Sequence, residues 1–304
     1  MERISRRTVL KTAAATAAWA AGPGFASHLM ANAMGLPIGL QLYSVRDLLP
    51  KDYDGTLKQL AAVGYREVEG AGFFGRSASD VKHSMDQAGL NCVSAHYSLP
   101  QLGPHVDEVL QFAKDLGLKY IICSSPGQPA SASPKPGGGG VKMEDLSLAD
   151  WRWNADQFNR IGEIVNAAGI RFGYHNHTAE FRTKDGVLIY DELLRLTDPA
   201  KVTMEMDCGW VVVGGKSPAD YLRRYPTRFS MLHVKDFNLT GAPASESAPP
   251  HAAELGRGSI DYRPIFEAAR KANVTHAFVE QEFFDGPPME ALKVDADYMK
   301  TLAV

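Results

Sequence analysis

Short strand-like runs alternate with helical patterns along most of this chain, and this alternation limits the fold more than any other feature. Strands are predicted at 38–43, 66–69, 91–96, 120–123, 171–175, 202–207, 230–235 and 276–280. Helices are predicted near 54–63, 78–88, 103–116, 150–168, 188–196, 217–224, 260–272 and 288–302. Eight strand–helix units are the pattern of a (β/α)8 barrel, which forms one domain of roughly 250 residues. We therefore predict the α/β class, with a single TIM barrel over residues 34–304.

An open, doubly wound parallel sheet is the competing architecture. Its dinucleotide-binding form carries G-x-G-x-x-G directly after the first strand, and this chain has no such motif there. Gly256-Arg257-Gly258 comes late and precedes the seventh predicted helix. The barrel is therefore favoured.

Residues 1–33 have the pattern of a cleavable export signal. Arg6-Arg7 is followed by an Ala-rich, mildly apolar run from Thr12 to Ala21, and Ala31-Asn32-Ala33 is a candidate cleavage site. Paired arginines in this setting resemble the twin-arginine signal, which predicts a periplasmic protein whose partner is the twin-arginine export machinery. An ordinary amphipathic helix is the alternative. The apolar run is shorter than the ~20 residues of a membrane span, so no stable span is expected after cleavage.

Charge and cysteine content narrow the class of partner. The formal net charge is −3, and removing residues 1–33 leaves 28 basic and 34 acidic residues. Such an acidic body disfavours nucleic acid as a partner. Cys92, Cys123 and Cys208 are scattered and odd in number, so no disulfide framework is expected.

Ionisable residues stand near the ends of several strands that a barrel normally fills with apolar side chains. Residues two apart on a strand share a face, so four pairs should point inward together. These pairs are His175 and His177, Glu205 and Asp207, His233 and Lys235, and Glu280 and Glu282. Buried charges need partners or a metal, and a mixed carboxylate and imidazole set suits one divalent ion: Mn²⁺, Zn²⁺, Co²⁺ or Fe²⁺.

Several polar residues have a structural interpretation beside the functional one. Glu205 lies deeper than Asp207 and is expected to be an internal hydrogen-bonding partner, and Asp236 is expected to orient a neighbour. Glu69 and His96 are each either core or site residues, and Trp210 either stacks on a sugar or packs in the core. Four further histidines are expected to be solvated: His83, His105, His251 and His276.

Five motifs together resemble a known family. Residues 174–181, Y-H-N-H-T-A-E-F, are similar to the Y-H-N-H-x-x-E-F signature of one branch of the sugar phosphate isomerase/epimerase family, which has the xylose isomerase-like TIM barrel. Similar later motifs occur at 207–210, 232–236, 256–261 and 279–282. The resemblance implies a metal held by a glutamate near strand five, an aspartate after strand six, a histidine on strand seven and a glutamate on strand eight.

Transferred to matching positions, the resemblance implies the metal ligands Glu180, Asp207, His233 and Glu280. Epimerase-type relatives carry a glutamate within strand five where this chain has His175, so Glu180 or His177 takes that place. Proton transfer is assigned to Glu280 or Glu180, assisted by His175 or His177. Further substrate contacts are expected from five residues: Lys235, His96, Trp210, Arg257 and Glu69.

A metal that chelates a carbonyl and its neighbouring hydroxyl stabilises an enediolate, which supports an isomerase or epimerase of a sugar or keto-sugar. The same chemistry with a leaving group gives a lyase, dehydratase or hydrolase of 3-keto-glycosides or an inosose. A non-catalytic periplasmic sugar-binding barrel is the alternative of another class. Because no phosphate-binding loop or arginine cluster is evident, a non-phosphorylated sugar is favoured. Two long connections, 124–150 and 237–259, are either tolerated insertions or mobile flaps over the site.

Overall fold

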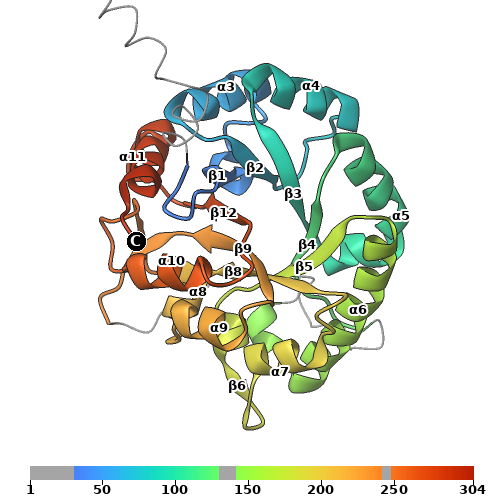
Figure 1. The fold of residues 1–304 in the computed structure, drawn as a ribbon. Coiled ribbons are helices and arrows are strands. Elements are labelled where there is room, and N and C mark those ends of the chain that lie inside the picture. Colours follow the sequence, from blue (N-terminus) through green and yellow to red (C-terminus); the bar gives the residue numbers. More distant parts are fainter. Residues whose placement is uncertain (1–30, 130–141, 242–247) are drawn as a thin grey trace, which may run out of the picture.

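A closed barrel of parallel strands forms the centre of the molecule (Figure 1). The computed structural model describes residues 31–129, 142–241 and 248–304. The barrel order is β1-β12-β9-β8-β5-β4-β3-β2, and β1 closes it by pairing with both β12 and β2. The strands are β1 (Gly39–Gln41), β2 (Glu67–Gly70), β3 (Asn91–Ser98), β4 (Tyr120–Ser125), β5 (Arg171–His175), β8 (Thr203–Asp207), β9 (Phe229–Val234) and β12 (His276–Val279). The predicted TIM barrel is confirmed.

Helices surround the barrel on its outside (Figure 1). They are α3 (Tyr53–Val63), α4 (Ala78–Ala88), α5 (Leu99–Leu116), α6 (Leu148–Ala167), α7 (Ile189–Leu196), α9 (Pro218–Arg224), α10 (Arg263–Ala269) and α11 (Pro288–Thr301). Each matches a predicted helix, with shifts at the ends. The helix α5 begins at Leu99 rather than near 103, because Ser98 and Gln101 form a capping box there.

Several short elements were not predicted, and most lie after the barrel strands. They are the helix α8 (Cys208–Val213), the 3₁₀ turns η1 (Leu42–Val45), η2 (Met143–Asp145) and η3 (Ala179–Phe181), and the two-stranded pairs β6 (Thr183–Lys184)–β7 (Val187–Leu188) and β10 (Asp236–Asn238)–β11 (His251–Ala253). The pair β10–β11 lies within the second long connection. Parts of both connections, 130–141 and 242–247, lie outside the described residues, as do residues 1–30 of the predicted signal.

The barrel interior changes character along its axis. Its middle is an apolar layer of Val93, Ile122, Met231 and Phe278. Below it, His276 Nδ1 contacts Glu67 Oε2 at 2.7 Å. The prediction that His276 is solvated is wrong, because this residue is the first of β12 and its side chain is buried against Glu67.

None of the helices in the described ranges is long and apolar enough to cross a membrane.

Asp295 on α11 is a buried carboxyl with an incomplete set of partners. Its Oδ1 accepts a hydrogen bond from Leu255 N at 2.7 Å, and its Oδ2 accepts none from the described residues. Burial raises the pKa of Asp295 to about 7, against about 3.9 for an exposed aspartate. The folded chain therefore keeps a proton that the unfolded chain releases, and stability falls as pH rises between these two values.

We expect Asp295→Asn to raise the melting temperature at about pH 8, by roughly 2–4 °C for each kcal/mol regained. At about pH 5 the gain should be small, since the wild-type carboxyl is already protonated there. Calorimetry at both pH values measures this difference. Asp297→Asn on the same helix is the control, because neighbouring Lys293 lowers the pKa of Asp297 and its removal should not stabilise the protein at high pH. A lower melting temperature for Asp295→Asn at about pH 8 would contradict the argument.

Candidate metal centre

The upper half of the barrel interior holds two connected layers of ionisable side chains. Strand alternation points Glu205 and Asp207 of β8 into the same space, and it does the same for His233 of β9 and Lys235, which follows that strand. All four side chains are buried. These two expected pairs therefore share a face, and both members of the other two pairs line one cavity: His175 and His177, and Glu280 and Glu282.

The outer layer contains a four-residue group with the composition of a divalent metal site. One ligand atom from each of His175, Asp207, His233 and Glu280 lies within 4.8 Å of the other three. His233 Nδ1 is 3.0 Å from Glu280 Oε2, and His175 Nε2 is 3.9 Å from Asp207 Oδ2. Two carboxylates and two imidazoles suit a divalent transition metal.

Asp207 provides a test of whether these residues fit a cation. Its Oδ1 accepts a hydrogen bond from Trp210 N at 2.8 Å and caps the helix α8. Its Oδ2 is buried and accepts no hydrogen bond from the described residues, and the Lys235 ammonium lies 2.9 Å from it. A buried carboxylate oxygen of this kind is costly unless a cation compensates it, and Lys235 is that cation in this structure. Because the oxygen already faces a cation and the donor set holds two carboxylates and two imidazoles, the outer layer also fits a divalent ion.

The deeper layer is a second candidate group, and it shares both histidines with the first. His96, His175, Glu205 and His233 also place one ligand atom each within 4.8 Å of one another. His175 Nδ1 lies 3.0 Å from Glu205 Oε2, and His96 Nε2 lies 2.6 Å from the same oxygen. His233 Nε2 lies 2.7 Å from Glu69 Oε2.

Imidazole chemistry decides between the two groups. A neutral imidazole has one N–H donor and one lone pair. Burial alone would lower the pKa of His233, but without a metal Glu205 and Glu280 raise it well above its usual value, so this ring is protonated. A bound metal would require both rings to be neutral, and if His175 Nδ1 and His233 Nε2 then donate to Glu205 and Glu69, the lone pairs of the opposite nitrogens face Asp207 and Glu280. The deep carboxylates then orient the rings, as outer partners of metal-bound histidines commonly do. The outer group is therefore the candidate metal centre.

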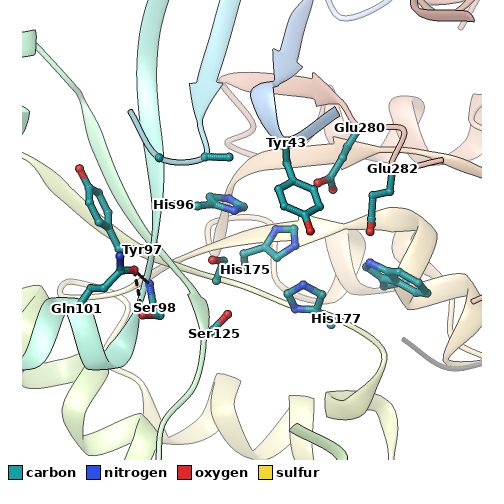
Figure 2. Close-up of a pocket in the computed structure, with 14 residues that line it drawn as sticks. Tyr43, His96, Tyr97, Ser98, Gln101, Ser125, His175, His177, Glu280 and Glu282 are labelled. Atoms are coloured by element: carbon teal, nitrogen blue, oxygen red, sulfur yellow. Dashed lines mark hydrogen bonds between the residues drawn. The ribbon is translucent and has the colours of Figure 1, made fainter. Parts of the chain in front are cut away.

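A polar cavity of about 420 Å³ opens onto this centre (Figure 2). Glu280, His175 and His177 line the side of the cavity next to the candidate metal centre, with Tyr43 and Glu282 beside them. Tyr97, Ser98, Gln101 and Ser125 form the opposite side in the same view. Among the described residues, no lysine or arginine lines it. The cavity thus presents carboxylates, imidazoles, hydroxyls and an amide.

The pKa values of the deep layer follow from burial and charge pairing. Burial alone would lower the pKa of His96, but Glu69 and Glu205 raise it to about 9. Burial alone would raise the pKa of Glu205, and Glu69 raises it further, but His233 and His96 lower it to about 2. The two deep glutamates are therefore carboxylates at neutral pH and accept hydrogen bonds from the imidazoles.

His177, beside the outer layer, is neutral at physiological pH. Burial, with the nearby ammonium of Lys235, lowers the pKa of His177 to about 3. Its Nδ1 has no hydrogen-bond partner among the described residues. His177 also lines the cavity, so its Nδ1 can accept a hydrogen bond from a bound molecule.

The structure brings three of the four predicted metal ligands together, and His175 completes the group in place of Glu180. Glu180 is buried in η3, where its Oε1 accepts hydrogen bonds from Tyr174 Oη at 2.6 Å and His177 N at 3.0 Å. Burial raises the pKa of Glu180 to about 7. The turn after β5 ends the strand alternation, so Glu180 does not point into the metal group. Its hydrogen bond from His177 N instead stabilises the segment that carries His177.

Of the five residues predicted to contact substrate, two line the cavity and three do not. His96 and Trp210 line the cavity, although Trp210 is also packed against Phe237. Glu69 and Lys235 are buried beside the centre and are not among the lining residues. Arg257 is exposed, lies 3.6 Å from Glu254, and does not line the cavity either.

Asp236 explains the Gly256–Ile260 motif in structural terms. Its carboxylate accepts hydrogen bonds from the backbone N–H groups of Gly256, Gly258 and Ile260. At Gly258 a Cβ would lie 2.3 Å from Asp236 Oδ1, so only glycine fits there. As expected, Asp236 orients a neighbouring loop.

Several cavity residues were not predicted from the sequence. Tyr43, Tyr97, Ser98, Gln101 and Ser125 reach the cavity from segments at the ends of β1, β3 and β4. Their position after barrel strands was the available signal, because barrel sites lie at that end. Residue type alone did not mark them, since serines and tyrosines are common at any surface.

We expect Glu205→Gln to weaken the affinity for Mn²⁺ or Zn²⁺ by about 10–100-fold, because the amide no longer fixes His175 through a charged hydrogen bond. Competition with a fluorescent chelator measures this affinity. Glu67→Gln is the matched control, since Glu67 is also a buried glutamate paired with a histidine but lies at the other end of the barrel. Equal affinity of Glu205→Gln and wild type would contradict the orienting role.

Comparisons with known proteins agree with the geometry. The family model described as "Xylose isomerase-like TIM barrel" matches residues 57–302. The chain is 24% identical over 247 residues to inosose dehydratase of Lacticaseibacillus casei, covering 72% of this chain and 78% of that protein.

Solved structures give the same result. A sugar phosphate isomerase/epimerase from Parabacteroides distasonis is 28% identical, with a TM-score of 0.69 over 87% of this chain and 98% of that one. A xylose isomerase-like TIM barrel protein from Mycobacterium smegmatis, solved in complex with magnesium, is 14% identical with a TM-score of 0.62 over 89% and 97%. This last similarity shows the fold alone.

Proposed function

Because the chain belongs to the xylose isomerase-like TIM barrel family, we propose that it is a metal-dependent isomerase or epimerase of a non-phosphorylated sugar or keto-sugar. One observation carries the proposal. The His175–Asp207–His233–Glu280 group lies at a polar cavity large enough for a sugar, and Glu280 and His175 line that cavity. A site that combines a possible Lewis acid with adjacent proton acceptors suits proton transfer next to a carbonyl.

The chain's own residues divide the work as follows. His175, Asp207, His233 and Glu280 would hold a divalent cation, which supplies stabilisation of negative charge on substrate oxygens. Glu280 is the cavity-lining carboxylate of the group and is the candidate for proton movement. His177 is neutral and lines the cavity, so it is placed to assist by accepting a hydrogen bond from a substrate hydroxyl. Hydroxyls of Tyr43, Ser98 and Ser125 orient substrate hydroxyls.

The side chains that line the cavity favour a substrate without a phosphate group. Phosphate recognition ordinarily uses arginine, lysine or the N–H groups of a helix N-terminus. Among the described residues the lining offers no lysine or arginine, and it contains the carboxylates of Glu280 and Glu282. The lining therefore lacks the groups that ordinarily recognise a phosphate.

Dehydration is a second candidate function, and the inosose dehydratases among the relatives favour it. The same proton abstraction leads to loss of water when a hydroxyl lies β to the carbanion. His96 bears a pKa raised to about 9 and lines the cavity, so a protonated imidazole is present to assist a leaving hydroxyl.

The test is proton NMR of metal-loaded protein with a panel of ketoses and keto-polyols in D₂O. Isomerisation or epimerisation should give a new sugar with deuterium at the carbon next to the carbonyl, whereas dehydration should give an unsaturated or diketo product. Asp207→Ala should lose both activity and bound metal. Bound metal without exchange or turnover across the panel would oppose both reactions and would favour a sugar-binding protein.

We also propose that residues 1–33 direct twin-arginine export to the periplasm; this rests on the sequence pattern alone. Changing both arginines, Arg6→Lys with Arg7→Lys, should retain a fused reporter in the cytoplasm, because the pathway requires the arginine pair. Cell fractionation measures the distribution. Unchanged export of the double variant would contradict the assignment.

A further inference from the structure

Lys235 lies in an unusual position for a side chain expected to contact substrate. Its Nζ is 2.9 Å from Asp207 Oδ2, 2.7 Å from Glu280 Oε2 and 2.7 Å from Glu282 Oε1. The side chain is only 4% exposed. It therefore places a buried ammonium among three carboxylates, two of which belong to the candidate metal centre.

Two neighbouring residues, Gly209 and Trp210, make room for the Lys235 side chain and contact it. At Gly209 a Cβ would lie 2.4 Å from Lys235 Cγ, so the glycine leaves room for the aliphatic stem. The ammonium lies 5.0 Å from the centre of the Trp210 ring, a distance at which a cation is attracted to an aromatic face. Lys235 is thus held on one side of the centre by Gly209 and Trp210.

The ammonium and a divalent cation require the same oxygen atoms. Asp207 Oδ1 is occupied by Trp210 N, so Oδ2 is the oxygen that Asp207 can offer to any cation. Glu280 Oε2 faces both His233 Nδ1 and Lys235 Nζ. Carboxylate oxygens bind Zn²⁺ at about 2.0–2.2 Å, which would place the metal close to the ammonium. Two positive charges at such a distance in a buried site repel strongly.

We propose that Lys235 is an internal counter-cation of the metal centre. Its ammonium neutralises Asp207 and Glu280 while no metal is bound, and metal binding displaces it toward Glu282. Glu282 is suited to receive it, because this carboxylate already contacts Nζ, is 25% exposed, lines the cavity and lies outside the four-residue metal group. This inference rests on the proposed metal centre.

The proposal explains how the outer layer tolerates its carboxylates when no metal is bound. Buried carboxylates without a partner are strongly destabilising, and Lys235 supplies the missing charge. The displacement also moves the ammonium toward the cavity wall formed by Glu282. Metal binding would therefore place a cation beside the substrate as well as in the centre.

Metal affinity of the full-length protein, measured by chelator competition with Mn²⁺ and Zn²⁺, tests the competition. Lys235→Gln keeps a hydrogen-bond donor but removes the charge, and it should bind metal at least about tenfold more tightly because the repulsion is gone. Lys201→Gln, which removes an exposed lysine paired with Glu163, is the control and should have wild-type affinity. Unchanged or weaker binding by Lys235→Gln would overturn the proposal.

A second variant tests the displacement and does not require Lys235→Gln alone to fold well. Glu282→Gln removes the acceptor of the displaced ammonium, so it should weaken metal binding by about fivefold or more in the wild-type background. In the Lys235→Gln background the same change should have less than half that effect, because no ammonium needs to move. Equal effects of Glu282→Gln in both backgrounds would show that Lys235 stays in place.

Thermal unfolding separates this inference from the proposed function. The metal-free Lys235→Gln protein should melt at a lower temperature than metal-free wild type. Saturating Mn²⁺ should raise the melting temperature of the variant by more than it raises that of wild type. If neither wild type nor any variant binds metal, the metal centre itself is wrong and the proposed function fails with it. If wild type binds metal and Lys235→Gln behaves like wild type, only the role of Lys235 is wrong.

Discussion

The arrangement of this site depends on two imidazole rings that each face carboxylates on both sides. His175 lies between Glu205 and Asp207, and His233 lies between Glu69 and Glu280. Burial alone would lower the pKa of His233, but without a metal the surrounding carboxylates raise it well above its usual value, so that ring is positively charged. A bound metal would require both rings to be neutral, and the deep carboxylates would then determine which nitrogen lone pair faces the outer layer. The position of the metal centre, its access to substrate and the need for a counter-charge all follow from this one constraint.

Charge balance then links the centre to the rest of the barrel. Glu69, Glu205, Asp207 and Glu280 are all buried, and a barrel interior cannot hold four carboxylates without compensation. The imidazoles of His96 and His233 form ion pairs with the deep carboxylates. The ammonium of Lys235 forms ion pairs with the outer carboxylates of Asp207 and Glu280. The apolar layer of Val93, Ile122, Met231 and Phe278 lies below these groups and separates them from the His276–Glu67 pair.

Much of this could be predicted from the sequence because parallel barrel strands obey simple rules. Apolar runs separated by helical segments identified the barrel, and alternation along β8 and β9 placed Asp207 and His233 inside. Prediction failed for residues outside the strands, where side chains no longer alternate between two faces, and for one strand residue. Glu180 lies on a turn, and the glycine motif holding Arg257 forms a loop around Asp236. His276 begins a predicted strand, but its side chain was expected to be solvated and is buried instead.

His175 stands where the family resemblance implies a strand-five glutamate, and this difference changes the electrostatics of the centre rather than only its ligand list. A glutamate there would add a further negative charge to a layer that already contains Asp207, Glu280 and Glu282. With a neutral imidazole instead, the outer layer carries fewer negative charges, and one lysine can neutralise part of what remains. A centre with three carboxylates and no lysine would hold a dication more tightly. The pairing of His175 with Lys235 therefore favours a metal that is bound less tightly.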